Sequence, residues 1–384
     1  MKNINENILN DTLDKSLERP YLLLTPGPLS TSKGVRTAML KDWCTWDKDY
    51  NNIVEDIRAQ LVALCVDEKN RDKYTAVLMQ GSGSFGVESV IGTALPKENG
   101  KLLVLANGAY GNRMGEIAEV LGINYIIEKF GDKAVVTPEK VKELLEKNPD
   151  VTHVSVVHSE TTSGILNPVF EIGKIVKEFG KIYIVDAMSS FGGVEIDLVK
   201  LGADFIISSS NKCIQGVPGF SFIICKKDVL EKCAGQARSL SLDLYSQWKT
   251  MEENHGKWRF TSPTHTVRAF YQALAELREE GGIKAREARY TENNKILREG
   301  MKELGFETLI SEEYQSPIIT SFIAPESEGY NFERFYQNLK KQGFVIYPGK
   351  VTEIESFRIG NIGEVYSQDI RELLEAVKKS IDWK

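Results

Sequence analysis

The chain has 384 residues, a hydrophobic fraction of 42%, a charged fraction of 27% and a formal net charge of −6. A chain of this length can form a large domain and a smaller one, with roughly 75% of its unfolded surface buried. The net negative charge argues against nucleic acid as the main partner, because phosphate backbones are bound by clustered Lys and Arg.

Five cysteines without a CxxC pair favour reduced thiols over a disulfide framework, and four histidines without zinc-like spacing predict no metal site. The first residues, 1–20, are polar and charged, and no run of about 18 apolar residues occurs in the sequence. We therefore expect no signal peptide, no membrane contact and a cytoplasmic protein.

Residues 1–30 are expected to form an N-terminal segment that ends in the shaped loop Thr25-Pro26-Gly27-Pro28. Up to about residue 225, short apolar runs then alternate with amphipathic helical patterns. The predicted strands are 75–79, 101–106, 125–128, 153–158, 182–185, 205–208 and 220–225, and the predicted helices are 51–65, 84–95, 111–121, 138–147 and 168–179. This alternation predicts a mainly parallel, seven-stranded sheet that is covered on both faces.

The pattern changes after residue 225. Two long helices are predicted, followed by three strands and a closing helix; their ranges are 264–280, 284–304, 317–324, 343–347, 355–360 and 367–381. We therefore predict an α/β chain with a large domain over 31–275 and a smaller C-terminal α+β domain over 276–384.

Ligands of open α/β sheets lie beyond the carboxyl ends of the strands, so the residues that follow each apolar run are the informative ones. The glycine-rich segment 81–88 follows a strand and begins a helix, where backbone N–H groups and the hydroxyls of Ser82 and Ser84 suit a phosphate. Alone, this segment is more often a plain glycine-rich turn than a phosphate site.

Asp186 and Lys212 each follow a predicted strand. By itself, the aspartate indicates only a nearby site, and a lysine is most often a solvated surface residue. Together with a phosphate cradle they match the needs of pyridoxal 5′-phosphate (PLP). This cofactor requires a lysine for its imine and a carboxylate against its pyridine nitrogen.

Several long, irregular segments carry a resemblance to a known family. They are LLLTPGPLS, DWCTWDKDYN, GSGSFGVES, NGAYGNR, HSETTSG, VDAMSSFGG, SSNKCIQGVPGF, RSLSLDLY, KWRFTSPTH and FRIGNIG. Over nearly its whole length the chain resembles the class V, fold-type I PLP aminotransferases. The resemblance implies that Lys212 is the Schiff-base lysine and that Asp186 binds the pyridine nitrogen.

The same resemblance implies further cofactor contacts. Thr161 would bind the phenolic oxygen, Tyr110 would stack on the ring, and Ser82, Gly83, Ser84 and Ser210 would hold the phosphate. Thr261 and Thr264 would reach the phosphate of a neighbouring subunit, which implies a homodimer with shared active sites.

Arg358 lies within an apolar C-terminal strand. A buried arginine needs an anionic partner, which is either a protein carboxylate or a ligand. In the family this position grips the acidic group of the substrate. The resemblance is strongest to members that pass the amine of 2-aminoethylphosphonate to pyruvate, giving phosphonoacetaldehyde and L-alanine in phosphonate degradation. The characteristic segments are 42–50 and 238–245, although no physical basis for phosphonate selectivity follows from them.

Three alternatives compete with this interpretation. Another class V aminotransferase, such as an alanine–glyoxylate or serine–pyruvate enzyme, would share the lysine, aspartate and arginine. A cysteine desulfurase on the same fold would need a mobile cysteine, and no cysteine occurs after Cys233. A nucleotide-binding module would need a GK[ST] sequence after the glycines, which is absent from segment 81–88.

Overall fold

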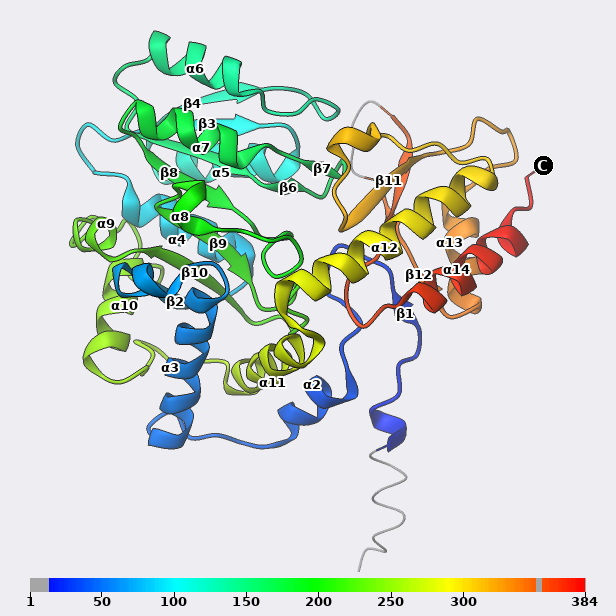
Figure 1. Ribbon diagram of the computed structural model, residues 1–384, viewed down its shortest axis with the longest axis horizontal. Coiled ribbons are helices and arrows are strands. Elements are labelled where there is room, and N and C mark those ends of the chain that lie inside the picture. Colours follow the sequence, from blue (N-terminus) through cyan, green and yellow to red (C-terminus); the bar gives the residue numbers. More distant parts are fainter. Residues whose placement is uncertain (1–13, 350–353, 384) are drawn as a thin grey trace, which may run out of the picture.

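The computed structural model describes residues 14–349 and 354–383, and Figure 1 shows their arrangement. The strands of the central sheet are β2 (Tyr74–Gln80), β3 (Lys101–Ala106), β4 (Asn124–Lys129), β5 (His153–Val157), β8 (Ile182–Asp186), β9 (Phe205–Ser209) and β10 (Phe220–Lys226). Their order across the sheet is β2-β10-β9-β8-β5-β3-β4. All neighbours are parallel except β10, which is antiparallel to both β2 and β9. The predicted mainly parallel sheet of seven strands is confirmed.

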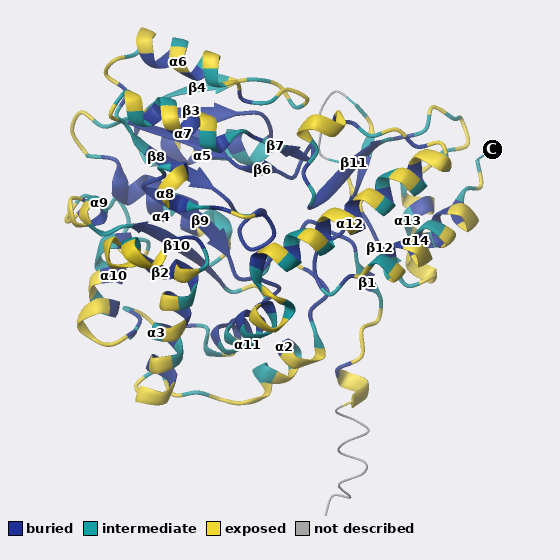
Figure 2. Cartoon of the chain, viewed as in Figure 1, coloured by how far each residue is buried: buried dark blue, intermediate teal, exposed yellow. Residues whose placement is uncertain are grey.

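The strands form because their residues are apolar along the whole run. Val77, Val104, Val156, Ile184 and Ile207, which come from five different strands, are fully buried. The strands of the central sheet are mostly dark blue, the colour of buried residues, in Figure 2. A strand in the middle of a parallel sheet is covered on both faces, so both sets of alternating side chains are apolar. This core fixes the carboxyl ends of the strands, where the candidate site lies.

Helices cover both faces of the sheet (Figure 1). In that view α4 (Gly83–Ala94) and α5 (Ala109–Val120) lie behind the sheet, and α7 (Val169–Glu178) and α8 (Leu198–Leu201) lie in front of it. The other helices of this part are α2 (Lys33–Thr37), α3 (Lys48–Ala63), α6 (Pro138–Lys147), α9 (Lys227–Glu231), α10 (Leu244–Glu253) and α11 (Thr264–Glu280). Connections between parallel strands of one sheet are right-handed. Helices that lead to a strand on one side therefore lie on the opposite face from helices that lead to a strand on the other side.

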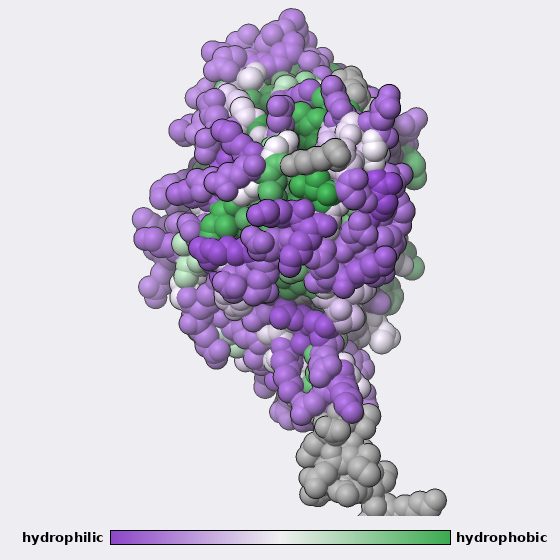
Figure 3. Space-filling view, turned by 90° about the vertical axis from the view of Figure 1, so that its right-hand side faces the viewer, coloured by the Kyte–Doolittle hydropathy of each residue, from purple (hydrophilic) through white to green (hydrophobic). Residues whose placement is uncertain are grey.

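The C-terminal part is built on a three-stranded sheet of β11 (Ile319–Ile323), β14 (Ser356–Gly360) and β13 (Tyr347–Pro348). Its helices are α12 (Gly282–Glu303), α13 (Phe332–Lys341) and α14 (Ser367–Ser380). A second apolar core, with Phe322, Phe335 and Phe357 fully buried, lies between these elements. The predicted α+β character of this part is therefore correct. Its outer face is covered mostly by hydrophilic side chains (Figure 3).

The N-terminal segment joins the C-terminal part instead of the large sheet. β1 (Leu22–Leu23) pairs in parallel with β12 (Phe344–Val345). A short hairpin of β6 (Ser159–Glu160) and β7 (Ile165–Leu166) follows β5. The chain turns between α11 and α12 at Gly281, and the domain boundary near residue 275 stays a prediction.

Three further observations concern the described residues. No helix among them is both long and apolar enough to cross a membrane. No group of three or more His, Cys, Asp or Glu side chains in this part of the chain is arranged to hold a metal ion. All five cysteines are free thiols, and four of them are buried.

Candidate active site

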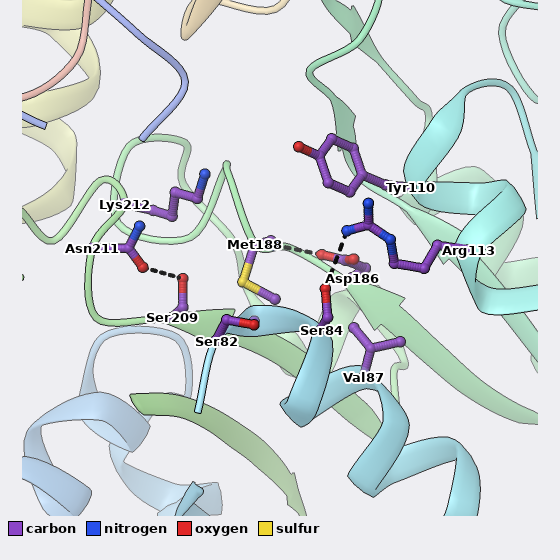
Figure 4. A pocket seen from close by; sticks show the side chains of 11 residues that line it. Ser82, Ser84, Val87, Tyr110, Arg113, Asp186, Met188, Ser209, Asn211 and Lys212 are labelled. Atoms are coloured by element: carbon purple, nitrogen blue, oxygen red, sulfur yellow. Dashed lines mark hydrogen bonds between the residues drawn. The ribbon is translucent and has the colours of Figure 1, made fainter. Parts of the chain in front are cut away.

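A cavity of about 250 Å³ opens beyond the carboxyl ends of the central strands. Figure 4 shows the side chains around it. The lining residues are Ser82, Gly83, Ser84, Val87, Tyr110, Arg113, Asp186, Met188, Ser209, Asn211 and Lys212. The cavity thus brings together the Gly-rich segment, the aspartate and the lysine that the sequence singled out separately.

Asp186 is the last residue of β8 and is 5% exposed. Its Oδ1 accepts a hydrogen bond of 2.8 Å from the backbone N–H of Met188. Burial raises the pKa of Asp186 to about 7, and nearby Glu160 adds to the rise, whereas Lys212 and Arg113 oppose it. A carboxylate that is desolvated in this way favours a cationic partner, such as a protonated ring nitrogen.

Lys212 follows β9, and its Nζ donates a hydrogen bond of 2.6 Å to the carbonyl of Pro26. Burial lowers the pKa of Lys212 to about 8, and Arg358 lowers it further, whereas Cys213 and Asp186 favour the charged form. The amine is therefore closer to its neutral, nucleophilic state than an exposed lysine is.

The loop Thr25–Pro28 lies directly against this lysine. A Cβ atom on Gly27 would approach Lys212 Nζ to 2.8 Å, and the φ of Gly27 is +123°. Both the close approach and the backbone conformation require glycine. The proline- and glycine-rich loop of the sequence therefore forms one wall of the lysine environment.

The start of α4 forms the opposite end of the cavity. Ser82 is the N-cap residue of this helix, and its side chain makes no capping hydrogen bond. A Cβ atom on Gly83 would lie 2.3 Å from Met188 Sδ, so glycine keeps the helix start open. Arg113 Nη1 donates a hydrogen bond of 3.1 Å to Ser84 Oγ. N–H groups, hydroxyls and a guanidinium gathered at a helix N-terminus suit a phosphate.

Ser210, which is expected to hold the phosphate, points away from this cavity, and its role stays a prediction. Its hydroxyl donates a hydrogen bond of 2.6 Å to the carbonyl of Val217, and it does not line the cavity. The adjacent Ser209 and Asn211 line it instead, and Ser209 Oγ donates to Asn211 Oδ1 at 3.0 Å. Successive side chains at a strand end point to opposite sides. The side chains that line the cavity are therefore those one position before and one position after Ser210.

Thr161 and Arg358 lie next to each other beside the cavity. Arg358 is 3% exposed, and its Nη1 donates a hydrogen bond of 2.8 Å to the carbonyl of Thr161. Its Nε donates to the carbonyl of Pro348 at 3.0 Å, and burial lowers its pKa. Within residues 14–349 and 354–383, no carboxylate forms an ion pair with Arg358, so its charge is available to a ligand anion.

Tyr110 lies in the first turn of α5 and lines the cavity. The guanidinium carbon of Arg113 lies 5.1 Å from the centre of the Tyr110 ring. Sequence reasoning missed Arg113, although its position three residues after Tyr110 in NGAYGNR places both side chains on one face of a helix.

Thr261 and Thr264 lie away from this cavity. Thr261 is exposed and lines a separate surface pocket of about 350 Å³ with Thr45, Tyr50 and residues 257–262. Thr264 is the first residue of α11. Within one subunit these threonines are not brought to the cavity, and their role in a neighbouring site stays a prediction.

The fold and this site define the class of protein. The family model described as "Aminotransferase class-V" matches residues 37–360. The chain therefore belongs to the class V aminotransferases, whose cofactor is PLP.

Curated relatives narrow the comparison. The 2-aminoethylphosphonate–pyruvate transaminase of Bacillus cereus is 57% identical over 364 residues, covering 95% of this chain and 99% of that enzyme. The enzyme of the same name from Syntrophobacter fumaroxidans is 59% identical over 364 residues, covering 95% and 97%. A bifunctional phosphonoacetaldehyde hydrolase/aminoethylphosphonate transaminase of Clostridioides difficile is 57% identical over 98% of this chain. The chain spans 58% of the length of that relative.

Solved structures agree on the fold. The pyridoxamine–pyruvate aminotransferase of Mesorhizobium loti superposes with a TM-score of 0.86 at 23% identity, covering 95% of this chain and 93% of that one. The alanine–glyoxylate aminotransferase of Nostoc sp. gives a TM-score of 0.85 at 23% identity, covering 94% and 95%. At this identity the likeness shows the common fold alone.

The residues present fit PLP. Among the described residues, the buried hydroxyl of Thr161 has no hydrogen-bond partner, as expected for a group that binds a cofactor oxygen. The cavity also offers a lysine amine, a buried carboxylate and a phosphate-binding helix start. These donors and acceptors match the aldehyde, the ring nitrogen and the phosphate of the cofactor.

Proposed function

We propose that this protein transfers the amino group of 2-aminoethylphosphonate to pyruvate, giving phosphonoacetaldehyde and L-alanine in phosphonate degradation. The observation that carries the proposal is Arg358, a buried cation beside the Lys212 site without a carboxylate partner among the described residues. High identity to transaminases of this name, over 95% of the chain, supports the choice of substrates.

When bound, PLP supplies a carbonyl that accepts the substrate amine and an electron-poor ring that stabilises a carbanion. Lys212 would hold the cofactor covalently and, once released, its Nζ would move the proton of the substrate carbon. Asp186 would keep the ring nitrogen protonated by ion pairing. Ser82, Gly83 and Ser84 would hold the phosphate, and Thr161 would orient the ring through its free hydroxyl.

Arg358 would bind the acidic group of each substrate in turn. Its Nε and one Nη1 hydrogen are committed to the carbonyls of Pro348 and Thr161, which fixes the plane of the guanidinium. The remaining N–H groups suit either a phosphonate or a carboxylate. Because both substrates would use one site, ping-pong kinetics are expected.

We further propose that the enzyme is a cytoplasmic homodimer in which Thr261 and Thr264 complete the phosphate site of the partner subunit. Large apolar side chains on this surface are exposed. Phe260, next to Thr261, is 49% exposed, and Trp46, whose ring centre lies 4.4 Å from Lys257 Nζ, is 78% exposed. Exposed aromatic groups of this size favour an interface. Five free thiols suit a reducing compartment. Sedimentation analysis tests the dimer, and a monomer at micromolar concentration would contradict it.

Steady-state turnover tests the proposed substrates. The PLP-loaded protein should form L-alanine from 2-aminoethylphosphonate and pyruvate far faster than it uses alanine with glyoxylate or serine with pyruvate. The alanine–glyoxylate and serine–pyruvate alternatives predict the reverse order. The matched control uses ethylamine as the donor, which lacks the phosphonate group. Its turnover should be much slower, because Arg358 then has no anionic group to bind.

A further inference from the structure

Glu160 is a buried carboxylate to which the proposed reaction gives no role. It lies in β6 with none of its surface exposed to solvent. Burying a charged group is costly unless hydrogen bonds compensate it, so the contacts of Glu160 indicate what it does.

Both oxygens of Glu160 accept hydrogen bonds. Oε2 accepts from the backbone N–H groups of Tyr110 at 3.2 Å and Gly111 at 3.3 Å. Oε1 accepts from the backbone N–H of Thr162 at 3.3 Å and from its hydroxyl at 2.6 Å. All four partners donate, so the ionised carboxylate satisfies every one of them. Burial raises the pKa of Glu160, and these four hydrogen bonds oppose that rise. The two amides at the start of α5 also favour an anion through the helix dipole.

The surrounding chain is shaped around this carboxylate. A Cβ atom on Gly108 would lie 2.4 Å from Glu160 Cδ and 2.5 Å from Thr162 Oγ1. The φ of Gly108 is 173°, an extended value that any residue adopts. Glycine is therefore needed here for space alone, because any side chain would displace Glu160 from the start of α5.

The contacts of Glu160 converge on residues of the active site. Tyr110, the expected ring-stacking residue, is held through its own backbone N–H. Thr161, the expected partner of the phenolic oxygen, lies between Glu160 and Thr162 in the sequence, so the hydrogen bonds between those two residues enclose it. The carbonyl of Thr161 in turn accepts the hydrogen bond of Arg358 at 2.8 Å.

We propose that Glu160 is a positioning residue: its buried carboxylate joins the first turn of α5 to residues 160–162 and so fixes Tyr110 and Thr161 against the cofactor. The inference rests on the proposed PLP site and not on the identity of the amino donor. Its negative charge also raises the pKa of Asp186 and favours the cationic form of Arg358.

Two kinds of variant separate the contacts. Glu160→Gln keeps the volume, but its NH₂ group faces donors, so cofactor affinity should fall about tenfold or more. Thr162→Val removes the hydroxyl donor and should weaken binding less, and Thr162→Ser, which keeps the hydroxyl, should recover most of that loss. Glu178→Gln, on the exposed surface of α7, is the matched control and should leave affinity unchanged.

The measurements are PLP titration of the cofactor-free proteins, the pH dependence of that affinity and the thermal unfolding of each cofactor-free variant. In Glu160→Gln the pH midpoint assigned to Asp186 should move to lower pH, because a neighbouring negative charge is lost. A purely structural role predicts lower thermal stability with unchanged PLP affinity and pH midpoint in the folded protein, and this result would overturn the inference.

The Thr162 pair keeps the inference testable if Glu160→Gln does not fold. Equal PLP affinity for the valine and serine variants would then count against it. Absence of activity toward 2-aminoethylphosphonate in the unaltered protein would refute the proposed function instead, since PLP binding would still report on Glu160.

Discussion

Replacing Arg358 by glutamine removes the positive charge that the account assigns to the acidic group of both substrates. The side chain is 3% exposed, so water cannot take over its role. Glutamine can keep one hydrogen bond to the carbonyl of Thr161, which limits the damage to the strand. The variant should therefore fold, bind PLP and lose affinity for both substrates.

The size of the loss follows from the contacts. Truncating one partner of a desolvated, hydrogen-bonded charge pair costs about 2–5 kcal/mol. Two of the donor positions of Arg358 are already committed to the carbonyls of Pro348 and Thr161, so we take a value in the lower half of that range. A loss of about 3 kcal/mol corresponds to a roughly 150-fold lower kcat/KM. Arg358→Lys keeps the charge but not the planar fork, and should lose about tenfold.

Initial rates of L-alanine formation, measured at varied 2-aminoethylphosphonate and varied pyruvate, give kcat/KM for each half-reaction. Arg371→Gln, an exposed arginine of α14, is the matched control. A kcat/KM within threefold of the unaltered enzyme for both substrates would refute the assignment of Arg358. A loss confined to one substrate would refute the shared anion site.

Three further predictions follow from the same geometry. Asp186→Asn should lower kcat by roughly a thousandfold, because an ion pair at about 4 Å contributes around 4 kcal/mol in a protein interior. The measurement is steady-state kcat, and a decrease of less than tenfold would contradict the prediction. The rate at which PLP attaches to the cofactor-free protein should rise about tenfold per pH unit up to pH 8 and then level off. The cause is that burial lowers the pKa of Lys212 to about 8 and only the neutral amine attacks. Stopped-flow absorbance measures this rate, and a rate that does not change with pH would contradict the prediction. Arg286→Met should lower the free energy of unfolding by about 3 kcal/mol in urea titration, because Arg286 is 2% exposed and binds Glu280 and the carbonyl of Cys213; an unchanged midpoint would show that this contact is not stabilising.

The strands of the large sheet could be predicted from the sequence because each is a continuous apolar run. The predicted run 101–106 coincides with β3, and 205–208 differs from β9 by one residue. In the C-terminal part, the predicted 343–347 proved to be two short strands, β12 and β13, in different sheets. Such short strands depend on long-range pairing, here with β1 and β14, which no local pattern reveals.

The candidate site shows the same limit. Lys212 and Asp186 could be placed because both follow strands whose carboxyl ends meet at one edge of the sheet. The choice between Ser209 and Ser210 depends on which side of the strand end faces the ligand, and apolar periodicity does not settle this. Glu160 and Arg113 escaped notice because their contacts with α5 and α4 form only in the folded chain.

The most direct test of the central claim uses a single half-reaction. PLP-loaded protein absorbs near 420 nm through the lysine-linked cofactor. Addition of 2-aminoethylphosphonate alone should abolish this band, and subsequent pyruvate should restore it while L-alanine appears. If the band persists with 2-aminoethylphosphonate but disappears when alanine or serine is added, the protein is an aminotransferase that does not use the phosphonate. That result would contradict the proposed substrate.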